Sequence, residues 1–250
     1  MGLSGLNGRR ALVTGAGRGI GAAIARRLAQ EGVAVAVNDV EPERVETMVQ
    51  ELTAAGHAAV AAVADVSRPD AAETLVADVT AALGGLEILV NNAGTGMRGS
   101  IAEHTPEEWR RVLGVNLDGP FWLSRAALPV LAGTPGAAIV NIASVAVIGF
   151  FGQVAYDASK GGLLTLTRSL AVECGRKGIR ANTVCPGFIE TELVTEELKR
   201  IGEKTVAALP LGRWGTAEDI AGTVAWLTCD DAAYVTGQSL MVDGGWVRGV

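Results

Sequence analysis

The sequence is poor in the residues on which several common kinds of protein site depend. Among its 250 residues there are only three cysteines and two histidines, and no two cysteines stand in a CxxC pair. These small numbers exclude a disulfide framework and argue against a zinc site or a Ser-His-Asp triad. We therefore expect no metal, and we expect Cys174, Cys185 and Cys229 to be reduced and buried.

Runs of basic residues and runs of apolar residues are also short. The formal net charge is −6, and no more than two basic residues are adjacent. A nucleic-acid partner would need a basic face and a membrane surface a basic cluster, so we expect neither partner. The longest apolar stretch, residues 58–64, is far below the ~20 residues of a membrane-spanning helix, and no signal-peptide core precedes residue 10. These features favour a cytoplasmic protein.

Small aliphatic side chains are abundant. Hydrophobic residues make up 49% of the chain but aromatic residues only 4%, so aliphatic residues supply most of the apolar surface. Seven short runs are apolar at consecutive rather than alternating positions, which is typical of parallel strands covered on both faces. The predicted strands are residues 10–14, 33–38, 58–64, 86–90, 137–142, 179–185 and 239–242.

Longer segments with helix signals alternate with these strands. Thr105 with Glu108, and Thr216 with Asp219, have the spacing of capping boxes at helix starts. Alternation of strands and helices from end to end predicts an α/β fold, a doubly wound Rossmann-type parallel sheet with helices on both faces. No repeat or linker divides the 250 residues, so we expect a single domain. A polar, helical insertion at residues 190–210 is expected to form a substrate lid.

A glycine-rich turn follows the first predicted strand and precedes an amphipathic helix over residues 22–30. Glycines let the backbone approach a diphosphate without a Cβ in the way, and the helix N-terminus offers free N–H groups and a partial positive charge. A glycine turn alone is weak evidence, but its place in a βαβ unit predicts a dinucleotide site. The candidate cofactor residues of this turn are Thr14, Gly15, Gly17, Arg18, Gly19, Ile20 and Gly21.

Asp39 closes the second predicted strand. A carboxylate at that place accepts hydrogen bonds from the adenosine ribose and repels a 2′-phosphate, which favours NAD(H) over NADP(H). The bland alternative is an exposed acid at the start of the next helix. Arg18 is the opposing signal, because a guanidinium in the loop can reach a phosphate.

Two further strand ends offer cofactor contacts. Asp65 and Val66 follow the third strand and are predicted either to bracket the adenine or, equally, to cap a helix. Asn92, Ala93 and Gly94 follow the fourth strand and are predicted to line the cofactor or to form a plain turn.

Tyr156 and Lys160 lie four residues apart and therefore on one face of a predicted helix. Tyrosine is a weak base at neutral pH because its unperturbed pKa is about 10, and a cation within ~6 Å lowers that pKa. Ser144 follows the fifth predicted strand, so its hydroxyl reaches the same edge of the sheet. Asn116 is unusual inside a helix over residues 107–131; it is either a satisfied core amide or a local break that holds a water.

In order and spacing, TGAGRGIG, NNAG, Asn116, Ser144, YDASK and Pro186-Gly187 resemble the short-chain dehydrogenase/reductase family across essentially the whole chain. The resemblance implies seven strands in the order 3-2-1-4-5-6-7. It implies that Tyr156 is the general acid/base, that Ser144 holds the substrate oxygen, and that Lys160 binds the nicotinamide ribose and depresses the pKa of the phenol. Asn116 would hold a water in a proton relay. Further implied cofactor contacts are Tyr156, Lys160, Pro186, Gly187, Ile189 and Thr191.

These roles describe an NAD(P)-dependent oxidoreductase that transfers a hydride between NAD(H) and a secondary alcohol or ketone. We expect the substrate pocket at Ser144, Gln153, Tyr156 and Phe188. Residues 186–191 look most like 3-oxoacyl-[acyl-carrier-protein] reductases, an alternative that would use NADP(H) and that Asp39 opposes. An alternative from another class is a non-catalytic dinucleotide-binding sensor, which would have no use for a tuned phenol.

The helix predicted over residues 155–174 is apolar on more than one side. A helix that is apolar nearly all round must be buried on several faces. We therefore expect it to pack on a second copy of the chain, in the homotetramer that the family resemblance implies.

Overall fold

The structure, a computed structural model, describes residues 2–191 and 196–247. Seven parallel strands form one sheet in the order β3-β2-β1-β4-β5-β6-β7, as the family resemblance implies. All seven runs predicted from the sequence are strands, with ends that differ by no more than two residues. The strands are β1 Arg10–Val13, β2 Ala34–Asp39, β3 Ala59–Val63, β4 Ile88–Asn91, β5 Ala138–Ile142, β6 Arg180–Pro186 and β7 Ser239–Val242.

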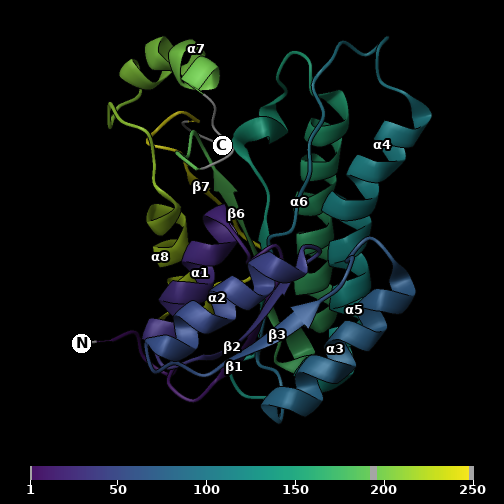
Figure 1. The fold of residues 1–250 in the computed structure, drawn as a ribbon, viewed down its shortest axis with the longest axis vertical. Helices are drawn as coiled ribbons and strands as arrows, with labels where there is room; N and C mark the ends of the chain where they lie inside the picture. The colour runs from purple at the N-terminus through teal and green to yellow at the C-terminus, as the bar shows by residue number, and fades with distance from the viewer. Residues whose placement is uncertain (1, 192–195, 248–250) are drawn as a thin grey trace.

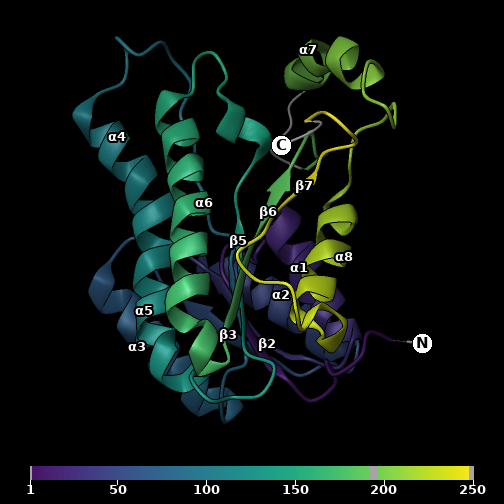
Figure 2. The same cartoon turned by 180° about the vertical axis from the view of Figure 1, so that it is seen from behind.

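Helices cover both faces of the sheet (Figures 1 and 2). One layer holds α1 Gly19–Gln30, α2 Pro42–Ala54 and α8 Ala217–Thr228; the other holds α3 Pro69–Leu83, α4 Pro106–Leu113, α5 Gly119–Leu131 and α6 Val154–Cys174. A further helix, α7 Glu196–Ala207, lies above the carboxyl edge beside β7.

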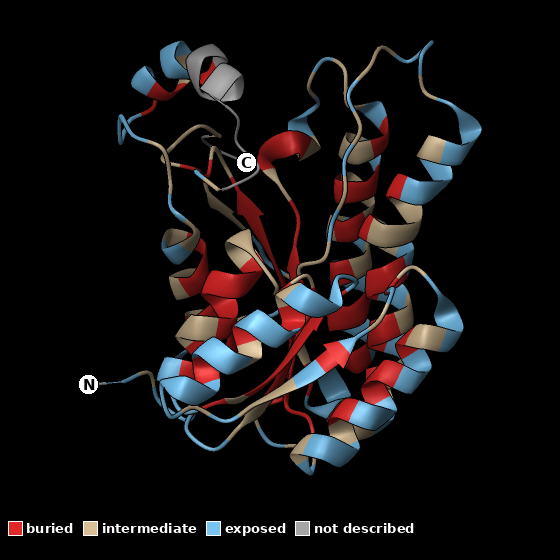
Figure 3. Cartoon of the chain, in the orientation of Figure 1, coloured by how far each residue is buried: buried red, intermediate tan, exposed pale blue. Residues whose placement is uncertain are grey.

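Each face of the sheet has its own apolar core. Leu12 and Val13 are adjacent in β1 and both fully buried, yet they belong to different cores because successive side chains point to opposite faces. Leu28 of α1 packs in the core that holds Val13, whereas Leu123 of α5 packs in the core that holds Leu12. Figure 3 shows the buried strands between two rows of helices that are exposed on their outer sides. Burial on both faces explains the consecutive apolar positions of the strands.

Both predicted capping boxes are present. The Thr105 hydroxyl accepts the Glu108 N–H at 3.2 Å, and the Thr216 hydroxyl accepts the Asp219 N–H at 3.3 Å. The long helix predicted through Asn116 is interrupted, because a π-helical turn, Gly114–Asp118, separates α4 from α5. Of the two possibilities predicted for Asn116, this turn agrees with a local break in the helix.

The three cysteines are free and buried, as expected. No helix in the described part of the chain is long and apolar enough to cross a bilayer. Helix α6 is buried on the side of the sheet, but Val172 on its outer side is 86% exposed. On the neighbouring helices Trp109 and Phe121 are exposed as well, at 39% and 42%. The layer of α4, α5 and α6 therefore leaves apolar side chains in contact with solvent.

Candidate active site

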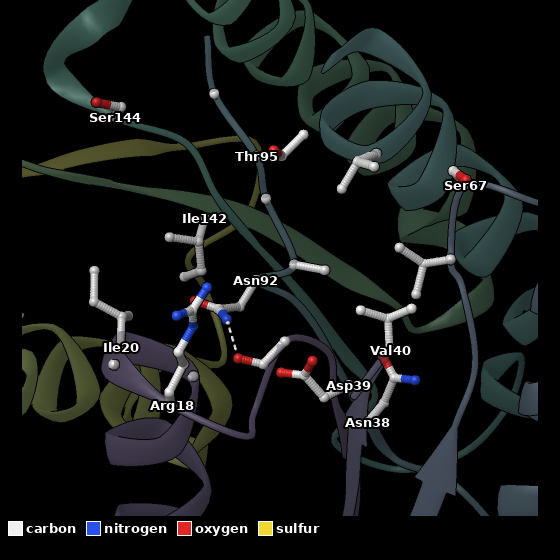
Figure 4. Close-up of a pocket in the computed structure, with 18 of the residues that line it drawn as sticks. Arg18, Ile20, Asn38, Asp39, Val40, Ser67, Asn92, Thr95, Ile142 and Ser144 are labelled. Carbon is white, nitrogen blue, oxygen red and sulfur yellow. Dashed lines mark hydrogen bonds between the residues drawn. The ribbon is translucent and has the colours of Figure 1, made fainter. Parts of the chain in front are cut away.

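One long pocket of about 1060 Å³ runs along the carboxyl edge of the sheet (Figure 4). It extends from Asp39, at the end of β2, to Ser144 and Tyr156. Most residues singled out in the sequence line it: Gly15, Arg18, Gly19, Ile20, Gly21, Asp39, Asp65, Val66, Asn92, Ala93, Gly94, Ser144, Tyr156, Lys160, Pro186, Gly187, Ile189 and Thr191. Thr14, Gly17, Asn116, Gln153 and Phe188 are not among its lining residues.

The turn between β1 and α1 packs directly against the backbone that follows β4. Gly15 has φ +60°, and a Cβ on it would lie 2.9 Å from the Cα of Ala93. A Cβ on Gly21 would lie 2.2 Å from the carbonyl oxygen of Gly15. Real Cβ atoms do not approach other atoms so closely, so both positions require glycine. The first residues of α1, Gly19, Ile20 and Gly21, line the pocket, and a helix N-terminus offers unpaired N–H groups to an anion.

Thr14 and Asn92 hold this turn in place. The buried Thr14 hydroxyl accepts the N–H groups of Asn92 and Ala93, each at 3.0 Å. In return the Asn92 amide donates to the carbonyl oxygens of Thr14 and Gly15, at 2.8 and 3.1 Å. Figure 4 labels Asn92 beside the turn, with a dashed line at its amide. Thr14 thus lies behind the pocket wall and fixes its shape.

The Asp39 carboxylate is fixed at the end of the pocket opposite Ser144 and Tyr156. It is 8% exposed, and it accepts the Gly17 and Glu41 N–H groups, both at 3.2 Å. Gly17 supplies that N–H from behind the pocket wall. Arg18 and Arg44 line the pocket as well, and Figure 4 shows the Arg18 side chain to the left of Asp39, with its guanidinium beside Asn92. A carboxylate fixed in this way can accept ribose hydroxyls, while the two arginines of the pocket wall supply positive charge for phosphates.

Asp65 makes a turn and lines the pocket at the same time. Its Oδ1 accepts the backbone N–H of Ser67 at 3.0 Å and the hydroxyl of Ser67 at 2.7 Å. Helix α3 starts later, and its N-cap residue is Arg68. Asp65 therefore shapes the loop before α3 rather than capping the helix itself, and it leaves Val66 beside it in the pocket wall.

Tyr156 and Lys160 stand one helical turn apart on α6 and both face the pocket. The Lys160 ammonium is 3% exposed, donates to the Ile142 carbonyl at 2.7 Å, and lies 5.6 Å from the centre of the Tyr156 ring. Ser144 follows β5, and its Oγ accepts the Ala146 N–H at 3.1 Å. In that bond the hydroxyl is the acceptor, so its hydrogen can donate to a second group, and the Tyr156 phenol oxygen lies within its reach.

Burial sets the protonation of both groups on α6. It lowers the pKa of Lys160 to about 8, because a charged ammonium is costly to bury. It also raises the pKa of Tyr156; the Ser144 hydrogen bond lowers that pKa, and the charge of Asp157 raises it further. The sequence-based expectation of a lowered phenol pKa differs from this result, because burial outweighs the other influences on Tyr156.

Asn116 connects the catalytic helix to the loop after β4. Its side chain is fully buried and donates to the Thr95 carbonyl at 2.8 Å and to the Ser159 hydroxyl at 3.0 Å. Its Oδ1 accepts the Thr95 N–H at 2.8 Å. A Cβ on Gly94 would lie 3.5 Å from Lys160 Nζ and 3.6 Å from Asn116 Oδ1, so both groups approach Gly94. The amide of Asn116 is thus satisfied by protein groups behind the pocket wall.

Gln153 and Phe188, two of the expected substrate contacts, are not among the residues that line the long pocket. Gln153 precedes α6, and its carbonyl accepts the Asp157 N–H at 2.9 Å. Phe188 packs edge-to-face on Trp214 and Trp246, with ring centres 5.9 and 5.4 Å away. It lines a separate small cavity of about 150 Å³.

Some lining residues were missed in the sequence. Arg44 enters the pocket from the first turns of α2, and Arg111 of α4 donates to the Thr95 hydroxyl at 2.7 Å. Arg44 lies five residues after Asp39, a spacing that sequence inspection can find, whereas Arg111 approaches only through the fold. Within residues 2–191 and 196–247, no group of three or more His, Cys, Asp or Glu side chains is arranged to hold a metal ion.

The geometry fits a nicotinamide dinucleotide. The pocket is continuous, its bare glycine backbone lies midway, and its ends carry the carboxylate and the phenol that a ribose and a reacting carbon would need. Gly15 and Gly21 are the positions where a Cβ would close the turn.

Comparison with known proteins gives matches over nearly the whole chain. The family model described as enoyl-(acyl carrier protein) reductase matches residues 15–247. The chain is 39% identical to (2S)-[(R)-hydroxy(phenyl)methyl]succinyl-CoA dehydrogenase subunit BbsD of Thauera aromatica, over 96% of this chain and 97% of that protein. It is 39% identical to 3-oxoacyl-[acyl-carrier-protein] reductase FabG of Staphylococcus aureus (95% and 97%) and 40% identical to cyclohexanol dehydrogenase of an Acinetobacter species (96% and 95%).

Solved structures match as closely. A blue fluorescent protein from a metagenomic library, in complex with NADPH, has a TM-score of 0.90 and 40% identity, over 97% of this chain and 99% of that chain. A short-chain dehydrogenase/reductase from Serratia marcescens has a TM-score of 0.90 and 36% identity, over 96% and 98%.

Proposed function

The chain belongs to the short-chain dehydrogenase/reductase family, and we propose that Tyr156 is the general acid/base of its hydride-transfer reaction. As a member of that family the protein is an oxidoreductase that acts on CH–OH groups and binds a nicotinamide dinucleotide. The observation that carries the role of Tyr156 is its position at the end of the pocket, with Ser144 beside it and Lys160 one turn away. The alternative of a non-catalytic sensor is therefore not retained.

In this mechanism the chain's own residues move the proton. The bound dinucleotide supplies the hydride donor or acceptor. The Ser144 hydroxyl, which lies beside the phenol, donates to the substrate oxygen and fixes it near Tyr156. In oxidation the Tyr156 phenolate takes the hydroxyl proton of the alcohol while the carbon gives up its hydride; in reduction the phenol returns that proton to the carbonyl oxygen.

Lys160 and Asn116 support Tyr156. A protonated Lys160 favours the phenolate by its charge, and its place in the pocket allows contact with the nicotinamide ribose. Asn116 holds Thr95 and α6 together, and in the proposed relay it keeps a water between Lys160 and solvent. Because burial raises the pKa of Tyr156, alcohol oxidation is expected to accelerate as the pH rises, and ketone reduction to slow.

We further propose that NAD(H) is preferred to NADP(H). The Asp39 carboxylate is held by two backbone N–H groups and cannot turn away from a ribose 2′-phosphate without losing them. Arg18 and Arg44, which also line the pocket, are expected to bind the diphosphate or the ribose edge. Similar folds bind NADPH, so the preference here depends on this one carboxylate.

The proposed substrates are secondary alcohols and their ketones with a partly apolar substituent. Ile148 and Phe151, in the loop after β5, and Ile101, in the loop after β4, are exposed apolar residues, at 53%, 95% and 74%. The second candidate is a 3-oxoacyl-[acyl-carrier-protein] reductase activity, which the identity to the Staphylococcus aureus enzyme favours.

We propose a single domain over residues 1–250 and a cytoplasmic homotetramer. The exposed apolar residues of the α4–α6 layer, Trp109, Phe121 and Val172, support association through that layer. Residues 190–210 are proposed as the substrate lid, of which residues 192–195 lie outside the described part of the chain. Light scattering at micromolar concentration tests the assembly: a tetramer is expected, and a monomer would contradict it.

A cofactor and substrate screen tests the function. Purified protein is assayed with a panel of secondary alcohols, ketones and a 3-oxoacyl thioester, each with NAD(H) and with NADP(H), by following the absorbance of the reduced cofactor. We expect turnover of an alcohol–ketone pair that is faster with NAD(H). Tight NADH binding without turnover of any carbonyl compound would overturn the proposed chemistry, and faster turnover of the thioester with NADPH would favour the second candidate.

A further inference from the structure

Asp157 follows the proposed catalytic tyrosine in the chain and is not among the residues that line the long pocket. Its Oδ2 accepts the backbone N–H of Phe150 at 2.7 Å, a contact between the first turn of α6 and the end of the loop after β5. Its Oδ1 is buried and has no hydrogen-bond partner among the described residues. Burying a carboxylate with a single protein partner costs free energy of folding. We therefore expect the hydrogen bond to Phe150 to have a structural role.

The loop that Asp157 holds carries Ser144 at its other end. Ser144 caps a short 3-10 helix, Val145–Ile148, through the bond from the Ala146 N–H. Gly149, with φ +87°, ends this helix, and Phe150 follows directly. Ser144 and Phe150 therefore flank the same short helix, and fixing Phe150 on α6 limits where Ser144 can lie relative to Tyr156.

A second, backbone hydrogen bond joins this loop to the loop after β4. The Gly99 N–H donates to the Gly152 carbonyl at 2.9 Å, so the loop after β4 is attached to the loop that Asp157 holds. These two loops carry the exposed apolar residues Ile101, Ile148 and Phe151. Asp157 thus holds the loop after β5, and the loop after β4 is bound to that loop.

We propose that Asp157 is a positioning residue that holds the loop of residues 145–152 on α6 and thereby keeps Ser144 opposite Tyr156. The proposal rests on the proposed function, because it takes Tyr156 and Ser144 as the groups that act on the substrate. Asp157 touches neither substrate nor cofactor in this account; it acts through Phe150 and Ser144.

Asp157 also contributes charge near the phenol. The groups that face Tyr156 are Lys160 and Asp157 on α6 and the Ser144 hydroxyl after β5; the Cys185 thiol of β6 acts on Lys160. The carboxylate of Asp157 raises the pKa of Tyr156 and so opposes phenolate formation. Asp157 therefore has two opposed effects: its charge disfavours the phenolate, and its hydrogen bond holds the loop.

Two substitutions separate the hydrogen bond from the charge. Asp157→Asn keeps a side-chain oxygen for the Phe150 N–H but removes the charge; Asp157→Ala removes both. With the best alcohol from the screen, Asp157→Ala is expected to lower kcat/KM about tenfold, mainly through a higher KM, since a buried N–H loses its acceptor. Asp157→Asn should keep KM within about twofold but move the pH midpoint of alcohol oxidation to lower pH.

The matched control is Glu218→Gln, which removes an exposed acid from the first turn of α8 and should change neither KM nor the pH midpoint. NADH affinity should stay the same in all three variants. The proposal is overturned if both Asp157 variants lose thermal stability but keep the KM and pH profile of the unsubstituted chain. Tyr156→Phe distinguishes failure of the proposed function from failure of the role of Asp157. If Tyr156→Phe stays active, the proposed function is wrong. If Tyr156→Phe is inactive but the Asp157 variants behave like the unsubstituted chain, only the role of Asp157 is refuted.

Discussion

The two ends of the pocket are built by different means. At the adenosine end, backbone groups of strand ends form the wall, and the buried Thr14 hydroxyl and the part-buried Asn92 amide hold that backbone in place. At the substrate end, side chains come from the loops after β4, β5 and β6 and depend on contacts between loops, such as Gly99 with Gly152. A ligand of constant shape can be bound by backbone, whereas a variable substrate requires side chains on loops.

The largest expected effect lies at the substrate end. Replacing Tyr156 by Phe removes only the phenol oxygen, so the proton has no donor or acceptor, and kcat should fall about 1000-fold. NADH affinity should persist because the glycine turn and Asp39 are untouched. Steady-state kinetics and NADH fluorescence titration measure the two quantities. The control is Tyr234→Phe at the other tyrosine, which is fully exposed. Substantial activity in Tyr156→Phe would show that the chemistry does not depend on the phenol at the substrate end.

A change confined to the adenosine end should affect binding and not chemistry. Asp39→Ala removes a charged acceptor for the ribose, so the Kd for NADH should rise about tenfold or more. The affinity for NADPH should improve because Arg18 and Arg44 remain. Calorimetric titration with both cofactors measures this, with Glu43→Gln, an exposed acid in the first turn of α2, as control. A chain that already prefers NADPH before substitution would refute the role given to Asp39.

The backbone wall itself can be tested at Gly21. A Cβ there would lie 2.2 Å from the Gly15 carbonyl and 2.4 Å from the Asn92 amide nitrogen. Gly21→Ala should therefore lower the free energy of unfolding by about 1–3 kcal/mol and weaken NADH binding, because the turn must shift. Chemical denaturation measures the first effect. Gly175→Ala, where a Cβ meets nothing within 4 Å, should be tolerated; equal losses in both variants would contradict this explanation.

The smallest effect on stability is expected in the substrate loops. Phe151 is 95% exposed, so Phe151→Ala should change the free energy of unfolding by no more than about 0.5 kcal/mol. If its ring contacts the substrate, KM should rise more for substrates with a large apolar substituent than for small ones. An equal KM change for both substrate sizes would show that the ring acts elsewhere.

Much of the adenosine end could be predicted from the sequence, because its signals are local. Each strand is one apolar run, the glycines follow β1 directly, and Asp39 is the last residue of β2. The local break at Asn116 was also predictable, since an amide inside an apolar helix is unusual.

The substrate end was harder to predict because its contacts join distant parts of the chain. Phe188 packs on Trp214 and Trp246, which lie far along the sequence, and so it turns away from the long pocket. The pKa of Tyr156 depends on its burial in the folded chain. The lowered pKa predicted from the spacing between Tyr156 and Lys160 therefore had the wrong direction.

The most direct test is a crystal structure of the complex with NADH. We expect the adenosine ribose hydroxyls to bind the Asp39 carboxylate and the nicotinamide ring to lie beside Tyr156 and Ser144, with its ribose at Lys160. A nicotinamide ring outside the space next to Tyr156, or an adenosine turned away from Asp39, would contradict the account.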